Sequence, residues 1–439
     1  MQQTKVAIVG MGTVGTGVAR LLIDHGDRTG RHAGRVLWVE KVVVGDVKKT
    51  REYDLPKGVL TDRLEDVLEN KEIKVVAQLV GGLEPARSIM LKLLESGKDV
   101  VTANKALLAE HGPELFDRAR ELGRSIAFDA SVCGGIPIIT NISQCFSANQ
   151  IQSLRGILNG TTNFILSQME ENGADYATVL KEAQRLGFAE ADPTMDVTGA
   201  DAAQKLAILA HLAFGARVHW RDIPLLGIDT LDAADIRYAG QLGYRIKLMA
   251  SAHRREGGLE LHVGPTLVRS GLPMAEVRGA FNAVSVIGDE VGPLFYHGLG
   301  AGQRPTASAV VADMIDMAVG RNQITFRTLE LWSNRVAEVQ MCDLSTLRGR
   351  FYLRFTVEDR PGVLADITGI LGKNEISIAS VMQHEPEETD NETTSAASPL
   401  VPLIIMTHSA LEGSVAKAVA EIGKLKSVKQ CAAKMRVMN

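Results

Sequence analysis

The chain has 439 residues, of which 45% are hydrophobic and 23% charged, and its formal net charge is −4. This length exceeds one ordinary hydrophobic core and predicts two to four domains at about 100–200 residues each. The charge balance argues against a nucleic-acid partner, cysteines without a CxxC pair favour a reducing cytoplasm, and no apolar stretch reaches the ~18 residues that span a bilayer.

Strand-like runs alternate with helical patterns over the first 140 residues of the chain. The strand-like runs are residues 5–10, 39–47, 75–82, 99–104 and 125–132. The helical patterns lie at residues 13–26, 63–70 and 85–97. Alternation of this kind is typical of a parallel sheet with helices on both faces, so an α/β fold is expected.

The pattern changes from about residue 140. Longer helical stretches are predicted at residues 175–186 and 198–214. Short strand-like pieces at residues 259–268 and 283–288 predict a separate sheet. Residues 300–320 indicate a turn that feeds a long helix.

A linker and a compact last unit are predicted for the remainder. Residues 321–349 combine weak periodicity with many charges, which favours a linker. From residue 351 the order strand, helix, strand, strand, helix, strand follows. The acidic and polar segment 385–399, between the middle strands, predicts a disordered loop.

The segment VAIVGMGTVGTG contains the spacing Gly10-x-Gly12-x-x-Gly15 between a predicted strand and a predicted helix. In this context the spacing predicts a dinucleotide site. Gly10 permits the tight turn, Gly12 lets the backbone approach a pyrophosphate, and Gly15 lets helix and strand pack closely. The free N–H groups of the helix N-terminus then meet the phosphate.

The residues after the second predicted strand bear on the choice of nicotinamide cofactor. Asp46 could accept hydrogen bonds from the ribose hydroxyls of NAD. Lys48 and Lys49 could instead meet the 2′-phosphate of NADP. The two lysines favour NADP slightly, and NAD stays open.

Carboxylates crowd the segment FAEADPTMDVTGADAAQKL, namely Glu190, Asp192, Asp196 and Asp201. Lys205 follows Asp201 at i,i+4, and an exposed helical pair of this kind would contribute only ~0.3–0.5 kcal/mol. The next residues, 206–214, are apolar on nearly all sides, so the helix is expected to be buried. A buried charge persists only when paired, so Lys205 is predicted to be a site group held by Asp201.

A second lysine, Lys105, follows a predicted strand at the edge where α/β sheets bind ligands. Acids that hold a substrate ammonium and a lysine that acts on its oxygen would suit an amino acid carrying an aldehyde or alcohol. Thiol chemistry is the alternative, and its candidate is Cys133. No histidine lies near Cys133 in sequence, so a small buried side chain is the favoured interpretation.

Segments spread over residues 1–320 closely resemble homoserine dehydrogenases of the bacterial type: residues 9–18, 102–109, 129–139, 156–166, 187–209 and 300–314. Residues 359–378 resemble an ACT domain. The resemblance implies a Rossmann-like dinucleotide-binding domain, an α+β substrate and dimerisation domain, and a ferredoxin-like ACT domain. The implied division is 1–140 plus 300–320 for the dinucleotide, 141–299 for substrate and catalysis, 321–349 as linker and 350–439 for ACT.

The resemblance also implies roles for single positions. Lys205 would donate a proton to the aldehyde oxygen, and Lys105 would lie near the nicotinamide and the substrate. The implied substrate-binding acids are Glu190, Asp201 and Asp196. Besides the motif glycines, the implied cofactor contacts are Thr13, Val14, Gly187 and Gly302. Some members bind a sodium ion, and the corresponding positions are Asp129, Val132, Gly134 and Ile136.

The implied activity is the NAD(P)-dependent interconversion of L-aspartate 4-semialdehyde and L-homoserine in threonine and methionine biosynthesis. The ACT domain implies threonine feedback through a loop near residues 359–364, and its pairing implies a homodimer or homotetramer. Two alternatives stay open. One is an aspartate-semialdehyde dehydrogenase that uses a cysteine. The other is a non-catalytic amino-acid sensor, against which the intact lysine and acid sets argue.

Overall fold

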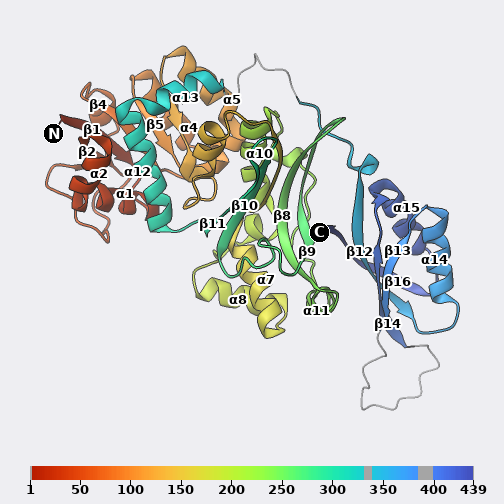
Figure 1. The fold of residues 1–439 in the computed structure, drawn as a ribbon. Coiled ribbons are helices and arrows are strands. Elements are labelled where there is room, and N and C mark those ends of the chain that lie inside the picture. Colours follow the sequence, from red (N-terminus) through yellow and green to blue (C-terminus); the bar gives the residue numbers. More distant parts are fainter. Residues whose placement is uncertain (1, 331–338, 384–398, 439) are drawn as a thin grey trace.

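The architecture is that of a computed structural model, which describes residues 2–330, 339–383 and 399–438. Figure 1 shows three parts in a row: an α/β unit with the N-terminus, a middle unit built on long strands, and a C-terminal unit coloured blue. Within these described ranges, no helix has the length and apolar character needed to cross a membrane.

The first unit is a parallel sheet with the strand order β3-β2-β1-β4-β5-β6. Its strands are β1 (Gln2–Val9), β2 (Arg35–Val43), β3 (Leu60–Thr61), β4 (Ile73–Gln78), β5 (Asp99–Thr102) and β6 (Ile126–Ala127). Its helices include α1 (Thr13–Asp24), α2 (Gly26–Ala33), α3 (Glu65–Leu68), α4 (Ala86–Glu95) and α5 (Lys105–Glu121). Alternate residues of β1 enter two different cores, Val6 and Ile8 on one face and Ala7 and Val9 on the other. The expected parallel sheet covered on both faces is thereby confirmed.

The chain returns to this unit late in the sequence through α12 (Gln303–Val319) and α13 (Arg321–Leu329). α12 packs so closely on α1 that a Cβ on Gly17 would lie 2.9 Å from the Cβ of Ala307.

Helix α13 shows that the prediction of a linker beginning at residue 321 is wrong. Phe326 stacks on Phe116 with ring centroids 5.4 Å apart, and Gln323 donates to Asp99. Few α13 residues are buried, which explains the weak apolar periodicity.

The middle unit combines an antiparallel sheet with helices. Its strands are β7 (Ile151–Ile157), β8 (Tyr244–Arg255), β9 (Gly258–Arg269), β10 (Phe281–Gly288) and β11 (Gly292–Leu299). Its helices are α7 (Gly160–Asn172), α8 (Tyr176–Arg185), α9 (Thr194–Val197), α10 (Ala200–Phe214) and α11 (Ala233–Gln241). Shorter pieces are α6 (Ile138–Thr140), a π-helical segment at Asn141–Cys145 and a 3₁₀ turn at Trp220–Asp222, and a further 3₁₀ turn at Leu344–Thr346 precedes the C-terminal unit.

The C-terminal unit follows the predicted order of elements. It contains β12 (Arg348–Glu358), α14 (Val363–Lys373), β13 (Ile378–Gln383), β14 (Leu400–Thr407), β15 (Ala410–Leu411), α15 (Glu412–Ile422) and β16 (Val428–Met438). β16 pairs in parallel with β9, with Arg436 opposite Thr266 and Met438 opposite Val268. The prediction of a second sheet, separate from the parallel one, is confirmed. This sheet extends beyond the middle unit, because it runs β11-β10-β7-β8-β9-β16-β12-β14-β13 through both units (Figure 1).

Two predicted strands also differ in extent, and one predicted loop lies largely beyond the described chain. The strand expected at 125–132 ends at Ala127, and Asp129–Ser131 forms a 3₁₀ turn instead. Ser131 Oγ donates to Phe128 O at 2.6 Å, a local contact that competes with strand pairing. The strand expected at 39–47 runs from Arg35 to Val43. Apart from Pro399, the loop predicted at 385–399 lies outside the described residues.

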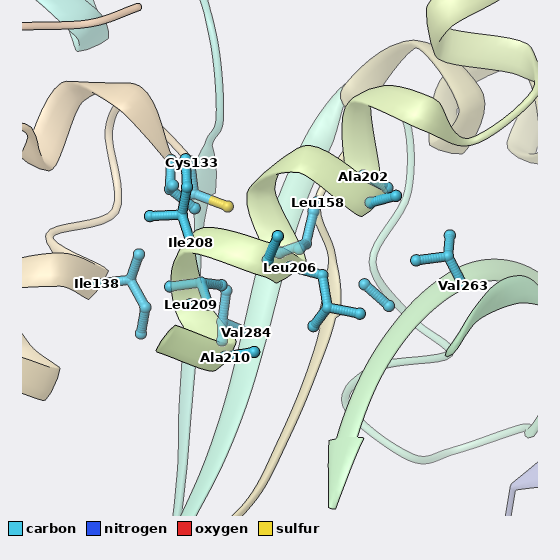
Figure 2. Packing of buried hydrophobic residues seen from close by; sticks show 14 of the residues in the cluster. Cys133, Ile138, Leu158, Ala202, Leu206, Ile208, Leu209, Ala210, Val263 and Val284 are labelled. Atoms are coloured by element: carbon cyan, nitrogen blue, oxygen red, sulfur yellow. The ribbon is translucent and has the colours of Figure 1, made fainter. Parts of the chain in front are cut away.

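Helix α10 forms the centre of the middle unit. Every residue from Ala200 to His211 is buried, as the apolar run predicts. Figure 2 shows Leu206 and Leu209 of this helix among side chains of other elements, including Ile138 and Val284. The two charged residues of α10 that concern the site, Asp201 and Lys205, therefore lie on an element packed on all sides.

Candidate active site

A glycine and close packing fix the start of α10. Gly199 precedes the helix with φ +85°, and a Cβ there would lie 2.7 Å from Leu225 Cδ1, so glycine suits this turn. Asp201 lies in the first helical turn, where a carboxylate is favoured by the helix dipole. Lys205 follows at i,i+4, and its side chain meets that of Asp201 on one face.

Asp201 is the centre of a buried ionic cluster. Its Oδ1 lies 2.7 Å from Lys105 Nζ, and its Oδ2 accepts hydrogen bonds from Lys205 Nζ and Asn159 Nδ2, both at 2.8 Å. Burial alone would raise the pKa of Asp201, but the charges of Lys205 and Lys105 outweigh burial and hold that pKa well below its usual range. Asp201 therefore stays ionised at neutral pH.

The two lysines differ in exposure and in partners. The Lys205 side chain is 10% exposed and also donates to Leu158 O at 2.7 Å, so two of its three N–H groups are engaged. The Lys105 side chain is 38% exposed and lies at the first position of α5, directly after the N-cap Asn104. The negative charge of Asp201 raises the pKa of Lys105. Both lysine side chains thus lie against one carboxylate.

Asp196 in α9 is a second, less tightly held carboxylate. Its Oδ1 accepts a hydrogen bond from Asn159 Nδ2 at 2.7 Å. Burial raises the pKa of Asp196, and the nearby charge of Asp201 raises it further. The structure therefore brings Asp196 and Asp201, which have four residues between them in the chain, together around one asparagine.

The other acids of the segment lie farther out. Glu190 is exposed and is not among the described residues that line the cavity, although its charge contributes to the raised pKa of Lys105. Asp192 is exposed and accepts a hydrogen bond from Thr194 Oγ1 at 2.6 Å. The four acids of this segment therefore form two groups: Asp196 and Asp201 are the inner acids, and Glu190 and Asp192 are the outer acids.

The inner acids and both lysines line a cavity of about 350 Å³. The predicted site residues in its wall are Lys105, Gly187, Asp196, Asp201, Lys205 and Gly302. Gly302 directly precedes α12, the helix that packs on α1. A volume of this order suits a small substrate together with one end of a cofactor.

The predicted dinucleotide loop has the shape that the glycine spacing implies. Gly10 has φ +98°, and a Cβ on Gly15 would lie 2.1 Å from Gly10 O. A Cβ on Gly12 would meet open space, and no side chain of the described residues caps the N-terminus of α1. Thr13 and Val14 begin that helix, so their backbone N–H groups are available to a phosphate. These residues fit the pyrophosphate of a dinucleotide.

Three cations gather after the end of β2. Lys48 and Lys49 are exposed, as is Asp46, whose Oδ1 accepts a hydrogen bond from Lys48 N at 2.7 Å. Arg51, which sequence reasoning missed, donates to Lys49 O at 2.6 Å and to Asp46 O. The loop therefore carries more positive than negative charge.

The predicted metal positions lie in the loop after β6: Asp129, Val132, Gly134 and Ile136. Asp129 and Asp313 are both 6% exposed and adjacent, and Asp129 N donates to Asp313 Oδ2 at 2.9 Å. Burial raises the pKa of Asp129 to about 6. Val132 O and Gly134 O accept no hydrogen bond from the part of the chain that the structure describes. Ile136 O accepts from Ile138 N at 2.7 Å, and Asp129 Oδ1 accepts from Thr140 N at 3.0 Å. The oxygens of Val132 and Gly134 are of the kind that a hard cation accepts.

Cys133, the candidate for thiol chemistry, does not have the surroundings of a nucleophile. Cys133 is 1% exposed, burial raises the pKa of its thiol, and its Sγ accepts a weak hydrogen bond from Asn282 Nδ2 at 3.4 Å. Neither Cys133 nor Cys145 lines the cavity. The cysteine mechanism of an aspartate-semialdehyde dehydrogenase is therefore not supported by the geometry.

Two asparagines of the site escaped the sequence analysis. Asn159 contacts both inner acids, and Asn282 Nδ2 donates at 3.0 Å to the Leu158 carbonyl that also holds Lys205. An asparagine directly before a predicted helix can signal its N-cap, and Asn159 does cap α7. Its contacts with acids about forty residues away could not be predicted from the neighbouring sequence.

Comparison with known proteins agrees with this geometry. The family model described as homoserine dehydrogenase matches residues 137–315, that of its NAD binding domain matches 10–129, and that of the ACT domain matches 351–426. The chain is similar to the homoserine dehydrogenase of Pseudomonas aeruginosa, with 43% identity over 100% of this chain and 99% of that protein.

Solved structures give the same result. A homoserine dehydrogenase from Thiobacillus denitrificans matches with a TM-score of 0.89 and 42% identity, covering 100% of this chain and 99% of the other. A hyperthermophilic archaeal homoserine dehydrogenase mutant in complex with NADPH matches with a TM-score of 0.61 and 25% identity, covering 73% and 98%. From the glycine loop through the lysine–carboxylate cavity to the ACT unit, this chain belongs to the homoserine dehydrogenase family of oxidoreductases.

Proposed function

We propose that the cavity catalyses the NAD(P)-dependent interconversion of L-aspartate 4-semialdehyde and L-homoserine. The observation that carries this proposal is the clamp of Asp201 between Lys105 and Lys205 in the cavity wall. A fixed ammonium can stabilise a substrate oxygen that becomes negative, and a neighbouring carboxylate can bind the amino group of the substrate. A substrate with an amino group at one end and an aldehyde or alcohol at the other uses both.

Lys205 is the proposed proton donor. The bound nicotinamide supplies or accepts the hydride, and in the direction of reduction negative charge develops on the substrate oxygen. Lys205 uses two N–H groups on Asp201 and Leu158 O, which leaves the third for that oxygen. The ammonium stabilises the developing charge and then transfers a proton. Lys105, more exposed and on the first turn of α5, lies nearer the nicotinamide side in this proposal.

The amino group of the substrate is assigned to the acids. Asp196 lines the cavity with one oxygen that has no hydrogen-bond partner within the described residues, so it can accept the ammonium. Asp201 contributes charge from behind the lysines, and Glu190 supports the outer end. Fixing the amine leaves one orientation of the reacting carbon.

NADP is the proposed cofactor, with NAD as the alternative. The loop after β2 offers Lys48, Lys49 and Arg51, and the Asp46 carboxylate already accepts from the backbone of Lys48. Cations in this position suit a 2′-phosphate. The similar archaeal enzyme in complex with NADPH supports the same choice. The pyrophosphate is assigned to Gly10, Gly12, Gly15 and the first residues of α1, and the nicotinamide end to Gly187 and Gly302.

A sodium ion is proposed for the loop that holds Asp129, Val132, Gly134 and Ile136. No cluster of three or more His, Cys, Asp or Glu side chains suited to a metal occurs within the described ranges, so backbone carbonyls would supply most ligands. Monovalent hard cations accept such oxygen ligands. Activity measured with sodium replaced by tetramethylammonium tests this assignment, and an unchanged rate would refute it.

Threonine feedback through the ACT domain is proposed for the loop at residues 359–364. Gly362 precedes α14 with φ +93°, and Gln383 of β13 donates to Asp359 at 3.2 Å. A short packed route leads from this domain toward the site. β16 pairs with β9, and Val263 of β9 accepts from Leu226 N at 3.0 Å, beside the turn that contacts Gly199.

A homodimer or homotetramer is proposed through exposed strand edges. β11 ends the long sheet, and Leu294, Phe295 and Leu299 on it are 36%, 40% and 45% exposed. An apolar edge strand of this kind favours pairing with another copy. Light scattering of the purified protein measures the mass directly, and a monomer at micromolar concentration would refute the assembly.

A single spectrophotometric assay tests the reaction and the cofactor together. Purified protein is mixed with L-homoserine and NADP, and in a parallel sample with NAD, while absorbance of the reduced nicotinamide is recorded. Turnover with NADP at lower cofactor concentration than with NAD is expected. No turnover with either cofactor would reject the function. Addition of threonine at millimolar concentration to the same assay should lower the rate, and an unchanged rate would reject feedback.

A further inference from the structure

Asn159 joins three elements around the cavity. It is 4% exposed, and its Oδ1 accepts a hydrogen bond from Thr162 N at 2.8 Å, which caps α7. Its Nδ2 donates to Asp196 Oδ1 at 2.7 Å and to Asp201 Oδ2 at 2.8 Å. One buried amide therefore links the start of α7 to carboxylates on α9 and α10.

The two carboxylates that Asn159 contacts differ in how many of their oxygens already have partners. Both oxygens of Asp201 are engaged, by Lys105 on one side and by Lys205 and Asn159 on the other. Asp196 lines the cavity, and its Oδ2 accepts no hydrogen bond from the described residues. The charged groups that act on Asp196 are Asp201 and both lysines, and the lysines are already paired with Asp201.

The peptide that carries Asn159 also serves the other end of the substrate. Leu158 O accepts from Lys205 Nζ at 2.7 Å and from Asn282 Nδ2 at 3.0 Å. The position of this one peptide therefore sets both the proposed proton donor and the proposed ammonium acceptor. Because the capped end of α7 holds the peptide, the distance between the two groups is built into the backbone.

We propose that Asn159 is a positioning residue for the amino group of the substrate, holding one oxygen of Asp196 so that the other faces the cavity as the ammonium acceptor. This inference rests on the proposed function. It separates the duties of the two acids: Asp201 keeps the lysines in place, and Asp196 binds the amine. Asp201 is less suited to the amine, because each of its oxygens already lies within 2.8 Å of a lysine Nζ.

Asn159→Ser tests the proposal, because serine retains an N-cap acceptor for α7 and loses the amide that reaches two acids. Three constants are measured: KM for L-homoserine, the inhibition constant of 4-hydroxybutyrate, which lacks the amino group, and KM for NADP. KM for L-homoserine should rise about tenfold, the size of one lost hydrogen bond to a charged group. The other two constants should change by less than about twofold.

Asp175→Ala is the matched control, because Asp175 caps the exposed helix α8 through Thr178 N at 2.9 Å and touches neither inner acid. It should leave all three constants unchanged. Asn159→Asp is the second variant, which retains size and cap but replaces the donor by a third carboxylate. If Asn159→Ser does not fold, the same three constants are measured on Asn159→Asp.

A double-mutant comparison identifies the residue through which Asn159 acts. In an Asp196→Asn background, Asn159→Ser should raise KM for L-homoserine by less than about threefold, because the acceptor it positions is already gone. A full tenfold rise there would overturn the proposal. Equal rises for L-homoserine and 4-hydroxybutyrate would also overturn it, since a general structural role predicts that result. Absence of turnover by the unmodified chain would instead reject the proposed function.

Discussion

Two buried aspartates, Asp201 at the cavity and Asp235 in α11, are held by cations in opposite ways. Arg354 of the C-terminal unit binds both oxygens of Asp235, at 2.6 and 2.8 Å, and Tyr352 OH donates to the same carboxylate at 2.9 Å. Asp201 is held by two separate lysines. A planar guanidinium closes off a carboxylate, whereas separate ammonium groups keep N–H directions free.

The comparison shows that a buried charge alone does not mark an active site. We name Asp235, Arg354 and Tyr352 the junction cluster, and Asp201, Lys105 and Lys205 the site cluster. Asp235 is 0% exposed and its partner Arg354 is 8% exposed, so the junction cluster is closed to ligands. The site cluster opens on a cavity and has donors to spare. The junction cluster is therefore expected to control stability, and the site cluster turnover.

Removal of the junction carboxylate should have the largest effect on folding. Asp235→Ala leaves the buried Arg354 with only the exposed Asp232, 3.6 Å away, and should reduce the free energy of unfolding by about 3–5 kcal/mol. Denaturant unfolding followed by circular dichroism measures this loss. Glu182→Ala, which removes an exposed partner of Arg185, is the control and should cause no measurable change. A loss below about 1 kcal/mol for Asp235→Ala would contradict the closed-cluster interpretation.

Removal of the site ammonium should affect turnover and spare the fold. Lys205→Ala should lower kcat about 100- to 1000-fold, because a preorganised donor to the developing oxyanion is lost. The dissociation constant for NADP, measured by fluorescence titration, should stay the same. Asp201 retains Lys105 and Asn159 as partners, so unfolding should change far less than for Asp235→Ala. A wild-type rate in this variant would remove Lys205 from the mechanism.

As pH falls, the stability contributions of two buried histidines, His262 and His253, should be lost before that of Asp201. Burial, with Arg436 adding to it, lowers the pKa of His262 to about 3, and burial with Arg155 lowers that of His253 to about 4. The unfolded chain protonates both near 6.5, so their stability contribution is present above that pH and is lost as pH falls toward the folded pKa values.

The slope of this loss can be measured. Each histidine should remove up to about 1.4 kcal/mol per pH unit below pH ~6.5. Denaturant unfolding over that interval should therefore show falling stability, and His262→Gln should flatten the slope. Asp201 behaves differently, because its folded pKa lies below its unfolded value. Its contribution is present above the ordinary carboxyl pKa and is lost as pH falls through that value toward the folded pKa. An identical slope in His262→Gln would show that His262 does not titrate on unfolding.

The smallest effect is expected at the rim of the junction cluster. Asp232 lies 3.6 Å from Arg354 Nη2 and its side chain is 56% exposed. Asp232→Ser retains an N-cap for α11 and removes only the outer charge, so unfolding should change by about 0.5 kcal/mol or less. Comparison with Asp235→Ala in the same denaturant series then separates buried from exposed pairing with one arginine. Equal losses in the two variants would contradict that separation.

Much of the fold and part of the site followed from local patterns. The glycine spacing of residues 10–15 predicted the dinucleotide loop, because a turn and a helix N-terminus are made from adjacent residues. The apolar run after Lys205 predicted a buried helix and thereby a paired lysine. Asp201 was named as its partner from i,i+4 spacing, and the structure confirms that contact.

Other features had no local signal. Nothing in residues 321–349 predicted α13, because that helix is held by few buried contacts with distant residues. The crowded acids could not be divided into inner and outer groups, because burial of Asp196 and exposure of Glu190 depend on the neighbouring elements. The role of Asn159 depends on contacts with Asp196 and Asp201.

The sequence by itself determined the family and the α/β class of the first unit, because both follow from patterns that can be followed along the chain. It also determined the glycine loop and the lysine–aspartate pair on α10, because each depends on spacing within one segment. Only the tertiary structure decided that Lys105 shares Asp201 with Lys205, that Asn159 joins the two inner acids, and that β9 and β16 make one sheet of two units. These are contacts between segments far apart in the chain, and their geometry is set by how the packed elements come together.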